Sequence, residues 1–130
     1  MSYRAPLSDI SFMLANVVDY KNLSSTSLYE DASLETTSAI LNEAAKLAEE
    51  VLAPLQRVGD LSPAILENGV VRTSPGFSDG YKAVAQGGWI GVAANQKYGG
   101  MGLPLTIQTC VNEMMNGACL SLALNPLMSQ

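Results

Sequence analysis

Apolar side chains recur along this chain at the spacing of an α-helix. In four stretches they fall near positions i, i+3, i+4 and i+7, which places them on one face of a helix. Polar or glycine-rich connectors separate these stretches. The pattern predicts helices over Ser8–Asp19, Ser33–Arg57, Phe77–Gln86 and Pro104–Asn125.

Residues that begin or end helices support these boundaries. Ser33 can accept a hydrogen bond from the free N–H groups of the second helix, and Ser8 or Asp9 can do the same for the first. Pro54 lacks an N–H donor, so the second helix should kink or end near it, before a break at Gly59-Asp60. Asn125-Pro126 should end the fourth helix.

The connectors carry turn signals and no clear sheet. Tyr20–Ala32 is rich in serine and threonine and predicts a loop with local turns. Asn68-Gly69 is a strong turn signal, and Val70–Thr73 fits a briefly extended segment. Because no second strand is evident, we predict no sheet. The expected fold is all-α, a small antiparallel helical bundle with residues 1–130 as one domain.

Charge is sparse in this sequence. Charged residues make up 15% of the chain and hydrophobic residues 48%, against roughly 25% charged in an average globular protein. Between Tyr98 and Gln130 the only formal charge is Glu113. We therefore expect more chain or another subunit to cover this end. The apolar face concerned comprises Ile107, Val111, Met114, Met115, Ala118 and Leu122.

Composition excludes several functions. The net charge of −5, with seven scattered cations, argues against a nucleic-acid partner. The apolar run from Gly117 to Met128 is too short for a membrane span. Cys110 and Cys119, nine residues apart on one predicted helix, lie too far apart for a disulfide. Reduced thiols and the lack of a signal peptide predict a cytoplasmic protein.

The residues offer little chemistry. With no histidine, serine–histidine and cysteine–histidine nucleophile pairs and most zinc sites are excluded. Glu113 is the one candidate for a lone carboxylate base, although exposure on the outer helix face is the favoured reading. Gly100-Met101-Gly102 begins a dinucleotide fingerprint, but Leu105 occupies the place of its third glycine. We expect no catalytic, cofactor-binding or metal-binding residue in this chain.

Two motifs in fixed order resemble the N-terminal helical domain of acyl-CoA dehydrogenases. The first is the helix segment Ala45–Leu55, which ends in Leu-Ala-Pro-Leu, followed by Gly59-Asp60. The second combines Gly87–Val92, with its Gly-Trp-Ile-Gly turn, and Lys97–Pro104, with Tyr-Gly-Gly-Met-Gly-Leu. The opening, Tyr3–Leu14, is similar to the 3-methylmercaptopropionyl-CoA dehydrogenase-like branch of the family.

The resemblance implies a part of a flavoenzyme. Such enzymes use FAD and a glutamate base to convert an acyl-CoA thioester to a 2-enoyl-CoA, and an electron-transfer flavoprotein reoxidises the flavin. The glutamate, the flavin contacts, the middle β-domain and the C-terminal helical domain lie outside these residues. The resemblance therefore implies that this domain helps to wall the acyl pocket, is inactive alone and belongs to a homo-oligomer.

The same resemblance indicates which residues lie near the substrate. The candidates belong to the glycine loop before the last helix and to that helix. They are Tyr98, Gly99, Gly100, Glu113, Met114 and Gly117. Two alternatives remain open. One is a non-catalytic helical module that self-associates or binds a partner helix through Thr106–Leu127, and the other is a carrier of fatty ligands.

Overall fold

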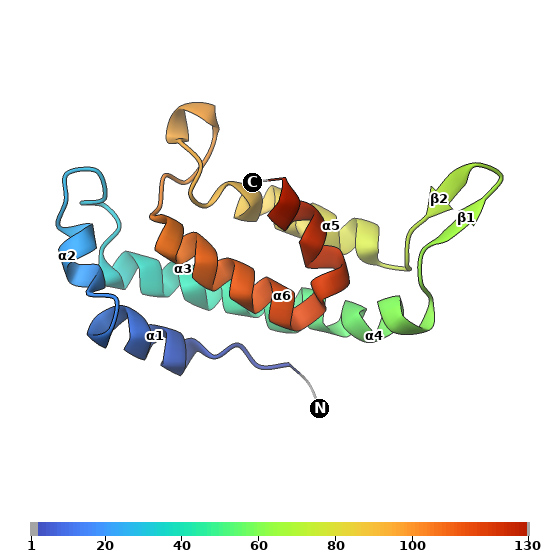
Figure 1. Ribbon diagram of the computed structural model, residues 1–130, viewed down its shortest axis with the longest axis horizontal. Coiled ribbons are helices and arrows are strands. Elements are labelled where there is room, and N and C mark those ends of the chain that lie inside the picture. Colours follow the sequence, from blue (N-terminus) through green and yellow to red (C-terminus); the bar gives the residue numbers. More distant parts are fainter. Residues whose placement is uncertain (1–2, 130) are drawn as a thin grey trace.

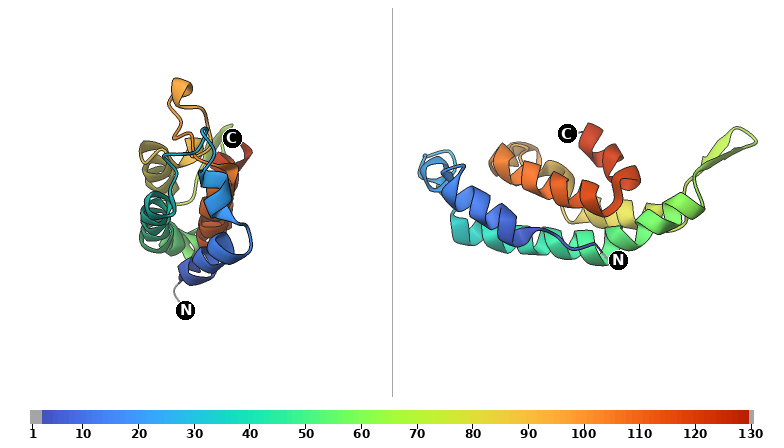
Figure 2. Two further views of the ribbon diagram at one scale, coloured as in Figure 1. Left: turned by 90° about the vertical axis from the view of Figure 1, so that its left-hand side faces the viewer. Right: turned by 60° about the horizontal axis from the view of Figure 1, so that its bottom comes forward.

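A curved helical rod runs along the molecule and carries the other elements (Figure 2). The computed structural model describes residues 3–129. The rod consists of α3 (Leu34–Lys46), the π-helix η1 (Leu47–Leu52) and α4 (Ala53–Leu61), and α6 (Leu105–Met128) packs alongside it (Figure 1). The remaining elements are α1 (Leu7–Asn16), α2 (Tyr20–Ser24), β1 (Ile65–Glu67), β2 (Val70–Arg72), α5 (Phe77–Gln86), η2 (Trp89–Gly91) and η3 (Gln96–Tyr98).

The uncharged face of α6 is the centre of the core. Ile107, Val111 and Met114 have no exposed surface, and Ala118 is 2% exposed. They pack against the rod, whose inward side chains include the fully buried Leu52. The expectation that more chain or another subunit covers this face is therefore wrong. The low charge of this face has an internal cause, since the face is buried within its own domain.

The rod accommodates Pro54 by widening rather than by ending. A proline has no N–H to donate, and its ring collides with the carbonyl of Glu50 one turn earlier. In the π-helical turn, the Ala53 N–H bonds to the Ala48 carbonyl, five residues back. Such turns relieve a local misfit inside a longer helix. The helix then continues to Leu61, so the predicted break at Gly59-Asp60 is wrong.

The last helix bends at an unpredicted position. Cys119 has non-helical backbone angles (φ −156°, ψ 84°), and the chain beyond it turns back over α5 (Figure 1). This bend buries Leu122 and Ala123. Helix continues through the buried Pro126 to Met128, so the predicted end at Asn125-Pro126 is wrong. Beyond the bend, Leu122 packs on α5, where a Cβ atom at Gly80 would lie 2.9 Å from it.

The first helix is shorter than its sequence pattern predicts. α1 ends at Asn16, and Asp19, in the left-handed conformation, precedes the short helix α2. Pro6 is the N-cap residue and no side chain caps this end, so the predicted Ser8 or Asp9 cap is wrong. By contrast, the Ser33 side chain accepts a hydrogen bond from the Thr36 N–H, which confirms the predicted cap of α3.

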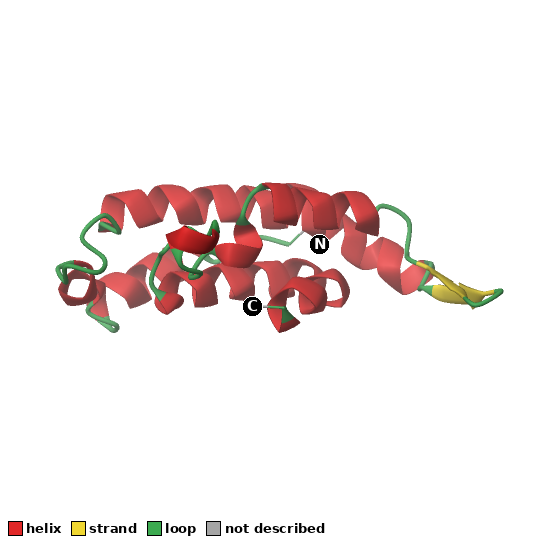
Figure 3. Ribbon diagram, turned by 90° about the horizontal axis from the view of Figure 1, so that it is seen from above, coloured by secondary structure: helices red, strands yellow, loops and turns green. Residues whose placement is uncertain are grey.

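A β-hairpin projects from one end of the helical body (Figure 3). β1 and β2 pair in antiparallel fashion around a turn in which Asn68 and Gly69 both have positive φ. Such angles suit the right-handed twist of two short strands. The prediction of no sheet is therefore wrong, and the fold of residues 3–129 is mostly helical rather than all-α. Every residue of the two strands is exposed. The strands therefore lack the alternation of apolar and polar residues by which a sequence reveals a half-buried strand.

The connector before α6 is folded tightly on itself. Met101 and Gly102 donate backbone hydrogen bonds to Gly91 and Ala94, each at 2.9 Å. The Ala93 N–H donates to the buried Gln108 side chain at 2.8 Å, which fixes the connector to α6. A Cβ atom at Gly100 would lie 2.0 Å from the Ala94 carbonyl oxygen. Glycine is therefore required at this position.

We expect Gly100→Ala to destabilise the fold by at least about 3 kcal/mol, because the new methyl group would collide with backbone. Gly91→Ala is the matched control, since its methyl group would meet its nearest atoms at 3.5 and 3.7 Å. The control should change the free energy of unfolding by less than about 1 kcal/mol. Urea unfolding followed by circular dichroism measures both, and equal stabilities would contradict the assigned close approach.

Candidate functional site

A surface groove lies beside the bend of α6. This kink groove, of about 790 Å³, is bounded by the end of α4, the base of the hairpin, α5 and the segment of α6 beyond Cys119. Its lining is mainly apolar with a hydroxyl and amide rim. The lining residues are Gly59, Pro63, Ala64, Thr73, Ser74, Phe77, Ser78, Tyr81, Lys82, Ser121, Leu122 and Asn125.

Two glycines allow the walls of the kink groove to approach. A Cβ atom at Gly59 would lie 2.8 Å from the Phe77 ring and 3.3 Å from the Ser121 hydroxyl oxygen. At Gly80 it would lie 2.6 Å from Leu55 and 2.9 Å from Leu122. These contacts join α4, α5 and the end of α6. The groove is thus a property of the packed fold.

The second groove lies between α1 and α6. This α1–α6 groove, of about 510 Å³, has an apolar lining with two carboxylates, Asp9 and Glu113. Its other lining residues are Pro6, Ile10, Met13, Leu14, Val18, Leu105, Thr106, Thr109 and Cys110. Burial raises the pKa of the Cys110 thiol, and the negative charge of Glu113 raises it further. The thiol is therefore protonated and unreactive at neutral pH.

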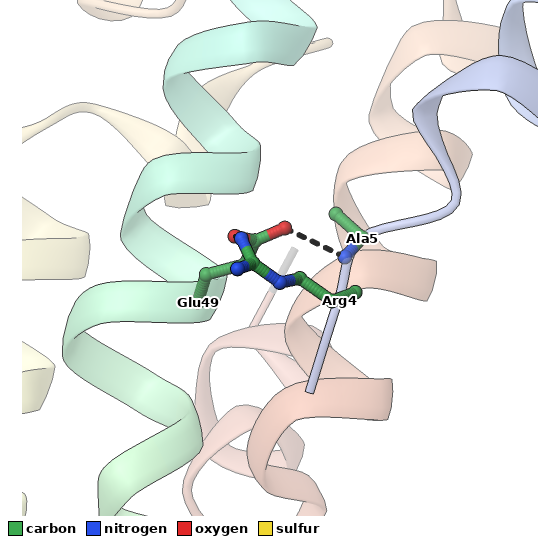
Figure 4. Close-up of polar contacts among 3 residues, drawn as sticks. All are labelled: Arg4, Ala5 and Glu49. Carbon is green, nitrogen blue, oxygen red and sulfur yellow. Dashed lines mark hydrogen bonds and ion pairs between the residues drawn. The ribbon is translucent and has the colours of Figure 1, made fainter. Parts of the chain in front are cut away.

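The extended arm before α1, residues 3–6, is tied to the rod by the carboxylate of Glu49 (Figure 4). The Ala5 N–H donates to Glu49 Oε1 and the Arg4 guanidinium donates to Oε2, each at 2.9 Å. The bond from Ala5 is the main cause that holds the pKa of Glu49 below its ordinary value; burial opposes it, and the hydrogen bond and charge of Arg4 add smaller lowering effects. Glu49 lies in the π-helical turn.

Tyr3, at the start of the arm, packs on α6. A Cβ atom at Gly117 would lie 2.9 Å from the Tyr3 ring, so glycine at this position leaves room for the aromatic side chain. Burial raises the pKa of the Tyr3 phenol, and the carboxylates of Glu113 and Glu49 raise it further. The arm thus covers the point where the rod and the middle of α6 meet.

The six candidate substrate residues have different surroundings. Tyr98 is 80% exposed beside Lys97, and Gly99 and Gly100 belong to the tight connector. The remaining three lie on α6: Met114 is in the core, Glu113 lines the α1–α6 groove, and Gly117 lies against Tyr3. Neither groove combines the loop with the helix. Glu113 is exposed on α6, which is the interpretation that the sequence favoured.

Sequence reasoning missed the arm and the kink groove. The aromatic side chains of Phe77 and Tyr81 share a predicted helix face, but the groove depends on the bend at Cys119. The tie at Glu49 depends on a residue 44 positions away, Ala5. Within residues 3–129, no set of three or more histidine, cysteine or acidic side chains lies close enough to bind a metal ion. The same range contains no helix long and apolar enough to span a membrane.

Replacing Glu49 should release the arm. In Glu49→Ala we expect the Ala5 amide hydrogen to exchange with solvent about fivefold faster at pH 7, because its acceptor is gone. Glu50→Ala, on the same helical turn, is the control and should leave Ala5 unchanged. Hydrogen exchange followed by NMR reads this position directly. Equal exchange in the two variants would show that Glu49 does not hold the arm.

The same tie predicts a pH dependence. Because the pKa of Glu49 is lowered by folding, its stabilisation is present above the ordinary glutamate value of about 4.3 and is lost as pH falls through the lower folded value. The wild-type arm should therefore stay docked down to about pH 4 and detach below it. Glu49→Ala should show no such step in Ala5 exchange.

Comparisons with known proteins agree with this architecture. Residues 35–130 match the family model described as "Acyl-CoA dehydrogenase, N-terminal domain". The chain is 32% identical over 129 residues to 3-methylmercaptopropionyl-CoA dehydrogenase of Ruegeria pomeroyi. That alignment covers 99% of this chain and 22% of the relative's length. The connector, α6 and all of the rod beyond Leu34 lie within the matched residues, and the chain belongs to the acyl-CoA dehydrogenase family.

Proposed function

We propose that this chain is the N-terminal domain of an FAD-dependent acyl-CoA dehydrogenase. The whole enzyme would remove hydrogens from the α and β carbons of an acyl-CoA thioester to give a 2-enoyl-CoA. The match of residues 35–130 to the family's N-terminal domain carries this proposal. The domain contributes structure and no acid–base pair. The proposal also holds that an electron-transfer flavoprotein accepts the electrons and that the enzyme is homo-oligomeric and cytoplasmic.

The described residues do not fit the diphosphate of FAD. A diphosphate needs several free N–H donors or cations. The α1–α6 groove is lined by two carboxylates and no cation, and Lys82 in the kink groove is paired with Asp79. The other ion-paired cations are Arg4, Lys46, Arg57 and Arg72, and Lys21 and Lys97 line neither groove. We therefore place the flavin contacts outside this domain.

The kink groove is the proposed wall for the acyl chain. Ligand pockets are typically about 300–1,000 Å³, mostly apolar, with a few polar groups. The kink groove has that size, with Phe77, Tyr81 and Leu122 along its apolar side and Ser121 and Asn125 at its rim. It is open to solvent on one side, where the rest of the enzyme would complete it. Acyl atoms in this groove would gain burial against its apolar side.

The glycine loop is the proposed contact for a polar part of the substrate. Tyr98 and Gly99 are exposed, and the Lys97 ammonium lies 5.5 Å from the centre of the Tyr98 ring. Met114 supports α6 from the core in this proposal, and Gly117 is held beneath Tyr3.

One observation favours a second function. Beyond the bend, Leu120, Leu124 and Met128 are exposed at four-residue spacing and form an apolar stripe. A helical module that self-associates without catalysis would use such a stripe. Analytical ultracentrifugation of residues 1–130 distinguishes the two: a stable discrete oligomer that Leu124→Glu dissolves supports the module, and a monomer argues against it.

The first test uses the polypeptide encoded by the full reading frame that contains these residues. We expect it to be purified yellow, with bound flavin that bleaches when an acyl-CoA is added, because substrate oxidation reduces the flavin. Residues 1–130 alone should bind no stoichiometric flavin. Tight flavin binding by the short chain, or a colourless long polypeptide that leaves acyl-CoA unchanged, would contradict the proposal.

The second test fills the kink groove in the same polypeptide. Ser121→Trp should raise the KM for longer acyl-CoA substrates about tenfold, equivalent to about 1.4 kcal/mol of binding, with less effect on the shortest substrates. Leu120→Trp is the control, because Leu120 is half exposed and does not line the groove. Stopped-flow bleaching of the flavin measures both. Equal effects in the two variants would remove the groove from the acyl site.

A further inference from the structure

We propose that the α1–α6 groove docks an amphipathic helix that carries a lysine or arginine and belongs to the same polypeptide outside residues 1–130. The proposal rests on the proposed function in one respect, since it requires a longer polypeptide. It goes further by assigning an interaction surface and the chemistry of its occupant. Three observations support it: the unused face of α1, the charge of the groove and the exclusion of a second copy.

The apolar face of α1 is only half used by its own domain. Ile10 and Leu14 are buried against the core. The apolar stripe continues through Met13 of α1 to Val17 and Val18, just beyond its end, and these three are 46%, 60% and 44% exposed. A helix of ten residues is marginal by itself and depends on packing. The exposed half of the stripe therefore has the composition of an interface.

The groove has the form of a helix-binding site. α1 and α6 supply its two walls, with Met13 and Val18 on one side and Leu105 on the other. An amphipathic helix binds such a groove through apolar side chains at i, i+3 or i+4, and i+7. Methionine side chains adapt to the shape of an incoming residue. The preferred occupant is thus a helix with one apolar face.

Charge specifies the occupant further. Asp9 and Glu113 line the groove from opposite walls, and neither belongs to the five ion pairs formed within residues 3–129. A docked helix would remove both carboxylates from water, which is costly unless a cation accompanies them. A lysine or arginine among the apolar positions meets this need. This assignment gives Glu113 a docking role rather than a place in the substrate wall.

A second copy of this chain does not fit the groove. Its exposed apolar helix faces are the outer face of α1, which carries Asp9, and the stripe beyond the bend of α6. The exposed apolar side chains of the hairpin belong to strands and lack the helical spacing that the groove selects. Neither Leu7–Asn16 nor the segment 120–128 contains a lysine or arginine. Outside the aligned region, the relative from Ruegeria pomeroyi has nearly four fifths of its length. The corresponding part of this polypeptide is the source that we assign.

Photocrosslinking in the full-length polypeptide identifies the occupant. The photoreactive residue p-benzoylphenylalanine replaces Met13, and, as a control, Ala15, which is on α1 but does not line the groove. We expect position 13 to crosslink within one polypeptide to a helix beyond residue 130, at least fivefold more than position 15. A mixture of isotopically light and heavy protein separates such crosslinks from those between copies.

Charge reversal tests the predicted cation. The double variant Asp9→Lys, Glu113→Lys should lower the crosslink yield at position 13 at least fivefold, whereas Glu30→Lys, on an exposed turn outside the groove, should not. Crosslinks to a second copy or to another protein, equal yields at positions 13 and 15, or no effect of charge reversal would each overturn the proposal. Flavin content and bleaching on the same preparations report separately on the proposed function.

Discussion

The fold depends on the burial of one face of α6 against the curved rod. Ile107, Val111 and Met114 are fully buried, and they meet a rod surface built from small and branched side chains such as Ala44, Ala48 and Leu52. Removing such side chains from water is the main force available to a chain with few charges. The N-terminal helix, the connector and α5 all take their positions from this contact.

The rod can make that contact along its length because it is not a uniform helix. The π-helical turn at Leu47–Leu52 lets Pro54 fit within a continuous helix and places Glu49 where it reaches the backbone of Ala5. One local adjustment thus serves both the rod and the arm. The hydrogen bond that holds the N-terminal arm is therefore made by a residue of the π-helical turn, Glu49.

Local sequence signals predicted the parts of the fold that depend on neighbouring residues. The bounds of α5, the cap at Ser33 and the start of the last helix follow from spacing and capping chemistry. The features that the sequence did not predict depend on packing between distant residues or lie on the exposed surface. The bend at Cys119 arises where α6 meets α5, and the hairpin has no buried face to give an alternating pattern. The kink groove and the arm were missed for the same reason.

The projecting hairpin also offers a practical opening for engineering. Its tip, Asn68 and Gly69, lies far from the helical core, and Gly69 has open space around its Cα. Exposed loop tips of this kind tolerate inserted sequence because the insertion disturbs no buried part of the domain. A fluorescent or affinity label inserted between these two residues would report on the protein while leaving both grooves untouched.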